Sequence, residues 1–398
     1  MPVVLKGLKV FASGGKRFTP ATVVSTPDYR FGVTGSTRSA LYWPFSSASA
    51  WNTPIGSSAT LSAAGISFIE SGPNSGGFAT RLRPEKERIY MNPSAATQLI
   101  EFNCYGWGGT PGCSEVDRVN ASTGGTWGGA PYFASFNVPA DVNYIVPDTG
   151  GNDCAAWVTS DSANVDQAQP LCHSTAGGDF TAQVKFSRVS ITGTGESGSH
   201  GGSNLSALGG TIRYGEVSNA VAHGLTYLSH ALKCNIDAHR FYYYSHPTGW
   251  VWPATTRDGY ASPSTYGGVN ANLVPGSLLT LQSSFNTTAG GGNVTTQLGS
   301  ILAETIKRFG MYCVDDTTWN AVAISVEEGP AGSTISEWTA LNAGYTIDYD
   351  PASLAGGNAF YQDMRNVFAG LYIVTNNGSG AVGGGGSATY STPAPASF

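Results

Sequence analysis

Short segments in which apolar residues occupy every second position recur along this chain, and they limit its fold more than any other feature. Two clear examples are 180–186 (FTAQVKF) and 321–327 (AVAISVE), in each of which the alternate apolar residues share one face. Gly, Asn and Ser turns separate such segments. Half-buried strands joined by tight turns are typical of antiparallel sheets. The sequence therefore predicts a mainly β fold, namely an antiparallel β-sandwich or jelly roll.

Helical patterns are few. The clearest is 295–310, where Leu298, Ile301, Leu302 and Ile306 fall on one face and Gly310 supplies a C-cap. A second helix is expected over 359–370, before the strand-like LYIVTN.

The chain divides into three parts by composition. Residues 1–40 are basic and rich in turn residues, which predicts an N-terminal arm that packs on another subunit. Residues 41–375 form the expected β-sandwich domain. Residues 376–398 are dominated by Gly, Ser and Pro, which predicts a flexible tail.

The charge and the apolar segments of the chain argue against nucleic-acid binding and against a membrane span. Only 12% of residues are charged, the net charge is −6, and no basic stripe exists, so nucleic acid is an unlikely partner. No apolar run is long enough to span a bilayer, and the first residues are too weakly apolar for a secretory signal. We expect either that a signal was removed or that the protein leaves its cell by another route.

Six cysteines occur in an arrangement that suggests three disulfides. Their spacings match no zinc ribbon. We expect the fold to be stapled by the pairs Cys104–Cys113, Cys154–Cys172 and Cys234–Cys313, in an oxidising compartment. Buried free thiols in a cytosolic protein remain the alternative.

The segment 239–260, HRFYYYSHPTGWVWPATTRDGY, is the densest group of aromatic and charged residues. Flat rings next to polar side chains suit the apolar faces and hydroxyls of sugars. If 239–244 is a strand, Phe241 and Tyr243 face the core. Arg240, Tyr242 and Tyr244 then face a groove. Two WGG repeats and a Gly-rich loop at 193–210 add further candidates, so the expected glycan-binding residues are Trp250, Trp252, Tyr260, Arg257, Asp258, His200, Trp107 and Trp127.

Two kinds of polysaccharide chemistry could use this segment. A lyase neutralises a uronate, abstracts the C5 proton and protonates the leaving oxygen. Arg240, Tyr242, Tyr244 and His246 could fill those roles, with His230 or His200 as another base. A hydrolase instead needs two carboxylates across a cleft. No motif marks the available acids, which are Glu216, Asp258, Asp315, Asp316, Glu327 and Glu328.

Cofactor and metal sites are not expected. The Gly-rich 193–210 lacks the Lys-Ser/Thr ending of a phosphate-binding loop, and no GxSxG motif occurs. The spacing of His223, His230 and Asp237 matches no short metal motif.

Five segments together resemble a group of secreted actinobacterial proteins of unassigned function. They are HGGSNLSALGGTIRYGE (200–216), HALKCNIDAHRFYYY (230–244), WPATTRDGYA (252–261), NLVPGSLLTL (272–281) and ETIKRFGMYCVDD (304–316). The resemblance covers about residues 180–330. It implies an extracellular, β-rich module that meets polysaccharide, and it carries no catalytic residues. The composition is also similar to that of phage tail-fibre and capsid-decoration proteins.

The sequence leads to one main hypothesis and two alternatives. The main one is a structural protein, on a virion surface or otherwise extracellular, that contacts glycans through an aromatic groove and assembles as a homo-oligomer. The first alternative is a polysaccharide lyase that acts on a uronate-containing polymer. The second is a purely structural building block whose arm, residues 1–40, inserts into a neighbouring subunit.

Overall fold

The computed structural model describes residues 33–34, 37–69, 79–102, 126–127, 130–131, 136–146, 152–178, 180–318, 320–341, 358–390, 395 and 397–398. Trp107, Cys104 and Cys113 lie outside these residues. None of the helices in the described part is long and apolar enough to cross a membrane.

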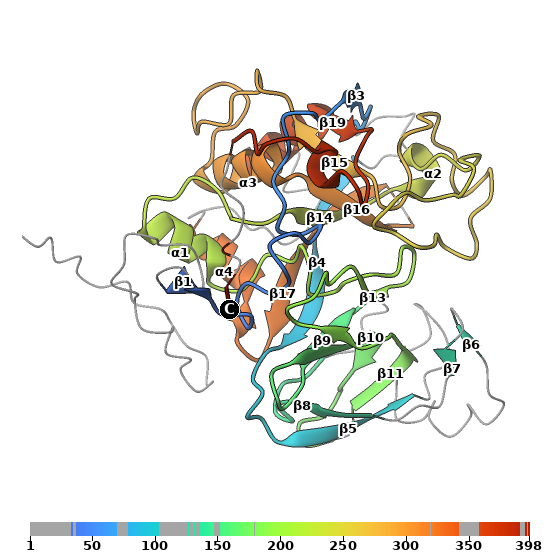
Figure 1. Ribbon diagram of the computed structural model, residues 1–398, viewed down its shortest axis with the longest axis vertical. Helices are drawn as coiled ribbons and strands as arrows, with labels where there is room; N and C mark the ends of the chain where they lie inside the picture. Colours follow the sequence, from blue (N-terminus) through green and yellow to red (C-terminus); the bar gives the residue numbers. More distant parts are fainter. Residues whose placement is uncertain are drawn as a thin grey trace, which may run out of the picture.

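One large mixed sheet of fourteen strands organises the molecule (Figure 1). Its main path, in spatial order, is β3 (Leu61–Ala63), β19 (Leu371–Val374), β15 (Leu278–Leu281), β16 (Met311–Asp316), β14 (Leu232–Ile236), β17 (Ala321–Gly329), β4 (Arg81–Tyr90), β9 (Ala155–Val158), β10 (Asn164–Cys172), β11 (Phe180–Lys185), β5 (Thr97–Phe102) and β8 (Phe136–Pro139).

The remaining strands are short. β12 (Val189–Ser190) pairs with β10, and β18 (Gly332–Ser333) pairs with β17. Two separate hairpins are β1 (Val33–Thr34) with β2 (Thr37–Arg38), and β6 (Thr126–Trp127) with β7 (Ala130–Pro131). The short β13 (Ser197–His200) forms isolated bridges with Leu205 and lies near β10.

The prediction of a mainly β fold is confirmed, but the sheet is mixed rather than an antiparallel sandwich. Strands β14 and β16 are parallel, and so are β17 and β4, β4 and β9, and β11 and β5. Parallel neighbours need long crossover connections. The chain supplies one between β14 and β16, which contains α2 (Ala238–Phe241), β15 and α3 (Gln297–Phe309). Long connections of this kind leave no signal in strand alternation.

The two predicted helices are confirmed. Helix α3 buries Leu298, Ile301, Leu302 and Ile306, and it ends at Gly310, whose φ of 80° suits a residue without a Cβ. Helix α6 (Ala359–Ala369) begins at Asn358, whose side chain accepts a hydrogen bond from the Tyr361 N–H. The described part of the chain also contains α1 (Glu216–Ala222), α4 (Thr334–Leu341) and a short 3-10 turn, η3 (Val382–Gly384).

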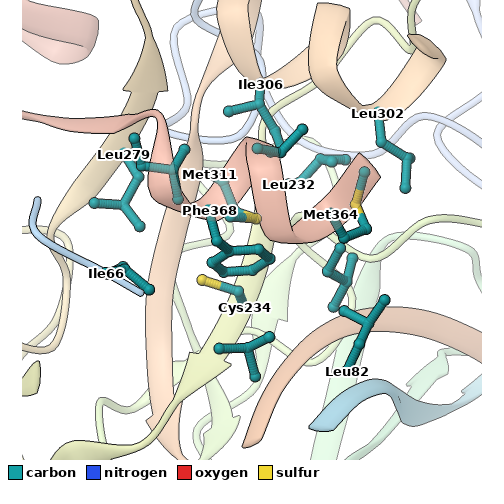
Figure 2. Close-up of a cluster of buried hydrophobic side chains, with 14 of the residues drawn as sticks. Ile66, Leu82, Leu232, Cys234, Leu279, Leu302, Ile306, Met311, Met364 and Phe368 are labelled. Carbon is teal, nitrogen blue, oxygen red and sulfur yellow. The ribbon is translucent and has the colours of Figure 1, made fainter. Parts of the chain in front are cut away.

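Helices α3 and α6 cover one face of the central strands with the largest hydrophobic core (Figure 2). There Leu302 and Ile306 from α3, and Met364 and Phe368 from α6, pack over Cys234 and neighbouring strand residues. Because the opposite face is also covered, all nine residues of β17 are buried, including those expected to face solvent. The buried opposite face is where polar groups gather.

The C-terminal segment is folded, which differs from the flexible tail expected from its composition. The Gly56 N–H donates to Gly383 O at 2.9 Å, and the Thr389 N–H donates to Ile55 O at 3.0 Å. Close approach between glycine backbones makes this packing possible, since a Cβ on Gly56 would lie 2.0 Å from Gly385 O. Near the end of the chain, the Arg38 N–H donates to Ser397 O at 3.1 Å.

Candidate functional site

Charged residues from five separate segments meet on the sheet face opposite α3 and α6. Four of those segments carry the resemblance described above, and they contribute His200, Lys233, Asp258 and Asp315. The fifth segment is β4, which contributes Glu87. Residues more than two hundred positions apart thus form one cluster, which sequence spacing alone does not reveal.

A chain of alternating charges runs inward through this cluster. Asp315 Oδ2 lies 3.3 Å from His200 Nδ1, and His200 Nε2 lies 2.8 Å from Glu87 Oε1. Glu87 Oε1 is in turn 3.1 Å from Lys233 Nζ. We refer to Asp315, His200, Glu87 and Lys233 as the ion-pair chain. All four are buried, so these contacts are weakly screened by solvent.

Lys233 anchors the inner end of the ion-pair chain. Its Nζ donates to Ser206 O at 2.6 Å and to Ala207 O at 2.7 Å, in addition to its contact with Glu87. An ammonium group has three N–H donors, and here each has an acceptor. Burial lowers the pKa of Lys233, while Glu87 opposes that shift. The complete set of partners explains how a lysine can be fully buried.

The charge states along the ion-pair chain support one another. Burial disfavours the charged form of His200, but the acidic neighbours Cys154, Glu87 and Asp315 outweigh it and raise the pKa of His200 well above its usual value. We attribute the rise to the two carboxylates, because burial raises the pKa of the Cys154 thiol to about 12 and keeps it neutral. Burial likewise disfavours the Glu87 carboxylate, yet His200 and Lys233 lower its pKa overall.

Strand register explains why these side chains share a face. Glu85 and Glu87 are two residues apart on β4, so both point to the same side. In the parallel pairing of β4 with β17, Glu85 lies beside Ser325. The residue before Ser325, Ile324, pairs with Cys234 of β14, which follows Lys233. Burial and the neighbouring Glu87 raise the pKa of Glu85 to about 8. This row of polar residues is therefore a product of sheet pairing.

At the outer end of the ion-pair chain, the carboxylates of Asp258 and Asp315 both lie close to the backbone of Gly202. A Cβ on Gly202 would lie 2.5 Å from Asp315 Oδ1 and 3.0 Å from each oxygen of Asp258. The gap between the two carboxylates cannot exceed these two distances placed end to end. It is thus shorter than the roughly 6.5–9.5 Å of inverting glycosidases and compatible with the roughly 5–5.5 Å of retaining ones. We call Asp258 and Asp315 the carboxylate pair.

The two members of the carboxylate pair have different environments. Asp315 is buried and accepts hydrogen bonds from the Asp316 N–H and the Asn152 side chain. Asp258 is partly exposed. Its burial, reinforced by the charge of Asp315, raises the pKa of Asp258 to about 7. Two carboxyl groups whose surroundings separate them in this way are suited to acid and base roles.

Three tyrosines surround the carboxylate pair. Tyr266 OH donates to Asp258 Oδ2 at 2.6 Å, Tyr260 OH donates to Asp316 Oδ2 at 2.9 Å, and Tyr242 OH donates to Asp315 O at 3.0 Å. Burial and the nearby carboxylates raise the pKa of Tyr260 and Tyr266 well above the usual value. These hydroxyls therefore serve as hydrogen-bond donors and not as bases.

Replacing Gly202 by Ala tests the geometry of the carboxylate pair. The added methyl group would collide with Asp315 and Asp258, so one of them must move. We expect a loss of about 1–3 kcal/mol in the free energy of unfolding, together with a loss of any catalytic activity. Urea denaturation gives the first quantity. Gly259→Ala is the control, because a Cβ at Gly259 meets nothing within 4 Å. Equal behaviour of the two variants would contradict this geometry.

Several buried polar atoms on this face have no hydrogen-bond partner among the described residues. They are Glu87 Oε2, Gln169 Nε2, Asn235 Oδ1 and Ser325 Oγ. Gln169 is otherwise fixed, because its Oε1 accepts from the Gly201 N–H at 2.9 Å. Such atoms are costly to bury unpaired, and in enzymes they commonly face water or a ligand. The site thus has unused hydrogen-bonding capacity.

One group of side chains has the composition of a metal site. Ligand atoms of Glu87, Cys154 and His200 lie within 4.8 Å of one another. However, Lys233 already supplies a positive charge to Glu87, and both nitrogens of His200 face carboxylates. A divalent cation would have to displace this pairing. The donor set therefore fits an ion-paired network better than a metal centre.

The prediction of a strand at 239–244 is wrong. Residues 238–241 form the short helix α2, so the expected alternation of faces does not apply. Phe241 is buried as predicted, but Tyr242 is fully buried in the core rather than facing a groove, and Tyr243 is only half-buried. Arg240 donates to Asn320 Oδ1 and to Ser67 O. A helix of only four residues is too short to show a helical period in the sequence.

The remaining histidine candidates lie elsewhere. His230 Nε2 is 2.9 Å from Glu216 Oε1, in a separate buried group. His246 lines a surface pocket with Asn272 and Asn377, and its Nδ1 is 3.1 Å from Thr248 Oγ1. The proposed lyase constellation is therefore not assembled around Tyr242.

Other predicted residues are distributed as follows. Trp250 and Trp252 are half-buried and pack on the same hydrophobic cluster, and Tyr260 is 47% exposed. Trp127 lies in β6, of which only the backbone is described. Of the six acids, Asp258, Asp315 and Asp316 come together. Glu327 pairs with Arg213 at 2.6 Å, and Glu328 accepts from Ser333 Oγ at 2.8 Å.

Two of the expected disulfides are absent, because the four described cysteines are buried and form no disulfide bond. Cys234 and Cys313 are neighbours on the parallel strands β14 and β16, inside the hydrophobic core. Cys154 faces His200, whereas Cys172 pairs with Thr181 at the far end of β10. These cysteines act as small core residues. The predicted Cys104–Cys113 pair lies outside the described residues.

Sequence reasoning missed Glu87, Lys233, Cys154, Asn152 and Gln169. A weak signal existed in β4, whose RLRPEKERIY is rich in charge for a strand. Comparisons with protein-family models, with curated proteins and with solved structures returned no match for this chain. Inferences about its activity therefore depend on the site itself.

Proposed function

We propose that this protein is a carbohydrate-active enzyme that hydrolyses glycosidic bonds with the carboxylate pair. One observation carries the proposal: Asp258, with its pKa raised to about 7, faces Asp315 across a gap that is too short for an inverting glycosidase and compatible with a retaining one. Tyr266 holds the Asp258 carboxyl group and His200 holds that of Asp315. A partly exposed acid beside a buried carboxylate is the arrangement that general acid catalysis requires.

The reaction begins at Asp258. Its carboxyl proton passes to the glycosidic oxygen as the bond to the anomeric carbon breaks. Asp315 forms a bond to that carbon and gives a glycosyl ester. Water then attacks the anomeric carbon while Asp258 accepts one of its protons, and the bond from that carbon to Asp315 breaks. Asp315 leaves as a carboxylate and Asp258 is again protonated. The product keeps the configuration of the substrate.

The ion-pair chain has a defined part in this mechanism. His200 holds its positive charge next to Asp315, Glu87 favours that charge, and Lys233 in turn favours the charge of Glu87. The Nδ1 of His200, 3.3 Å from Asp315 Oδ2, holds that carboxylate in position. His200, Glu87 and Lys233 do not touch the substrate in this mechanism, so they are positioning residues.

The tyrosine-based lyase is less well supported than hydrolysis. Burial and the nearby carboxylates raise the pKa of Tyr260 and Tyr266, and Tyr242 is fully buried. Neither alternative base is free, because His200 is paired with Glu87 and His230 with Glu216. A hydrolase gives new reducing ends without an unsaturated product. A panel of polysaccharides should therefore be incubated with the protein and assayed for reducing ends and for absorbance of the unsaturated uronate. Reducing ends without absorbance support hydrolysis, and the absorbing product contradicts it.

A second candidate function is glycan binding without cleavage, and the exposure of Tyr260 favours it. Trp250 and Trp252, half-buried on one cluster, could extend such a surface. We expect Trp250→Ala with Trp252→Ala to weaken glycan binding about tenfold or more, because stacked aromatic rings contribute about 1 kcal/mol each. Glycan-array binding of the parent and of the double variant measures this. Unchanged binding in the double variant would remove these tryptophans from the surface.

The proposal also covers where the protein is located and how it assembles. The low charge and polar, glycine-rich composition favour an extracellular or virion-surface location and assembly as a homo-oligomer. Free buried thiols are equally compatible with a reducing compartment, so the location depends on composition alone.

A further inference from the structure

A guanidinium group is held rigidly one residue before the acid of the carboxylate pair. Arg257 Nη1 donates to Tyr244 O at 2.7 Å, and its Cζ lies 4.5 Å from the centre of the Tyr244 ring. On another side it packs on backbone, since a Cβ at Gly249 would lie 2.7 Å from Arg257 Cδ. Gly249 has a φ of 82°, which only glycine adopts readily. Arg257 is therefore preorganised.

Most of the donors of Arg257 are unused. Tyr244 O is its one hydrogen-bond acceptor among the described residues, and no described carboxylate forms an ion pair with it. Arg88, Arg213 and Arg308, in contrast, each pair with a carboxylate within 2.6 Å. The side chain of Arg257 is only half-buried, so its free N–H groups can reach a ligand.

The surroundings of Arg257 leave its charge available. Burial and the charge of Arg257 lower the pKa of His246, so this neighbour is neutral at physiological pH. Tyr244 presents its ring face and carbonyl oxygen. Asp258 follows directly in the chain, and it directs its carboxyl group toward Gly202 and Tyr266. An immobilised guanidinium with free parallel donors matches a planar carboxylate.

We propose that Arg257 binds the carboxylate of a uronic acid unit, so that the substrate of this site is an acidic polysaccharide. This inference rests on the proposed hydrolase function, to which it adds the class of substrate. A sulfate ester offers similar oxygens with tetrahedral geometry, and the experiment distinguishes the two.

Binding should be measured in the Asp258→Asn background, so that cleavage does not consume the ligand. Isothermal titration with polygalacturonate, alginate and glucuronan is compared with their carboxyl-reduced forms, which keep the same linkages. We expect at least one uronate polymer to bind, and Arg257→Met to weaken it about 10–100-fold. Arg257→Lys should recover part of the loss, and the reduced polymers should bind weakly and equally to all variants. Raising the salt concentration should reduce the difference.

Lys86→Met is the matched control, because Lys86 is an exposed cation on β4 whose side chain points away from Glu85 and Glu87. Equal loss in Lys86→Met and Arg257→Met would overturn the inference, and so would tighter binding of dextran sulfate than of every uronate polymer. Cleavage of a neutral polymer with no uronate binding would overturn it too, while leaving the hydrolase proposal intact. Uronate binding that depends on Arg257, without cleavage of any polymer by the parent protein, would support the inference and refute the hydrolase.

Discussion

Replacing Asp258 by Asn is expected to lower the rate of glycosidic cleavage about 10²–10⁴-fold while the protein stays folded. The amide cannot supply the proton that the leaving oxygen needs, but it keeps an oxygen for the hydrogen bond from Tyr266. Substitution also removes a carboxyl group that burial and Asp315 make costly to ionise. The variant should therefore unfold at the same or a higher urea concentration than the parent.

The pH dependence follows from the same residue. A general acid works only while protonated, and the pKa of Asp258 is raised to about 7. Its contribution is thus complete below that pH and falls about tenfold for each further pH unit above it. The upper limb of kcat/KM against pH reports this group in the free enzyme. A rate that rises steadily to pH 9 would exclude Asp258 as the acid.

Asp141→Asn is the control for this experiment. Asp141 is exposed and its carboxylate accepts a hydrogen bond only from Asn143 nearby, so the substitution makes the same chemical change outside the site. Its activity should equal that of the parent. If Asp258→Asn keeps activity within about threefold of the Asp141→Asn variant, the acid must be another group.

Replacing Lys233 by Met is expected to lower the free energy of unfolding by about 3–5 kcal/mol. The methionine fills nearly the same volume, so loss of packing is small. After the substitution, His200 is the one remaining cation beside the Glu87 carboxylate in the ion-pair chain. The buried carbonyl oxygens of Ser206 and Ala207 also lose their donor. A buried charge that loses one partner is far less stable than a complete pair. Urea denaturation of each variant measures the change.

Two further variants separate charge from packing. Lys233→Met combined with Glu87→Gln removes the unpaired charge and keeps an oxygen near His200 Nε2, so it should recover part of the lost stability. Lys86→Met removes an exposed cation from the neighbouring position on β4 and should change stability by less than about 0.5 kcal/mol. If Lys233→Met is as stable as Lys86→Met, the ion-pair chain does not stabilise the fold. If the double variant is less stable than Lys233→Met, the charge of Glu87 is not the cause.

Much of the local structure was predictable. The helix over 297–309 and its Gly310 cap follow from periodicity within a single segment, and so does the presence of strands at 180–185 and 321–329. These features depend on neighbours one to four residues away. The short helix at 238–241 was missed because one turn is too short to show a period.

Some residues of the candidate site were predictable from the sequence and others were not. Asp258, Asp315 and Asp316 were recognisable as candidate acids, and His200 as a residue of a ligand-facing loop. Lys233 and Glu87 were not, since a lysine or glutamate in a strand usually faces solvent. Their burial arises from pairing: β4 joins β17, β17 joins β14, and the loop after β13 covers the polar face between them.

The sequence alone determined that this chain is mainly β, with helices at 297–309 and 359–369 and an unusual density of rings and charges near 239–260. Only the tertiary structure decided that the sheet is mixed, that the four cysteines in the described part of the chain form no disulfide and that Asp258 meets Asp315 around Gly202. The reason is physical. Alternation and capping are set by contacts between near neighbours, whereas strand order and charge pairing depend on contacts between residues up to hundreds of positions apart, which no local pattern encodes.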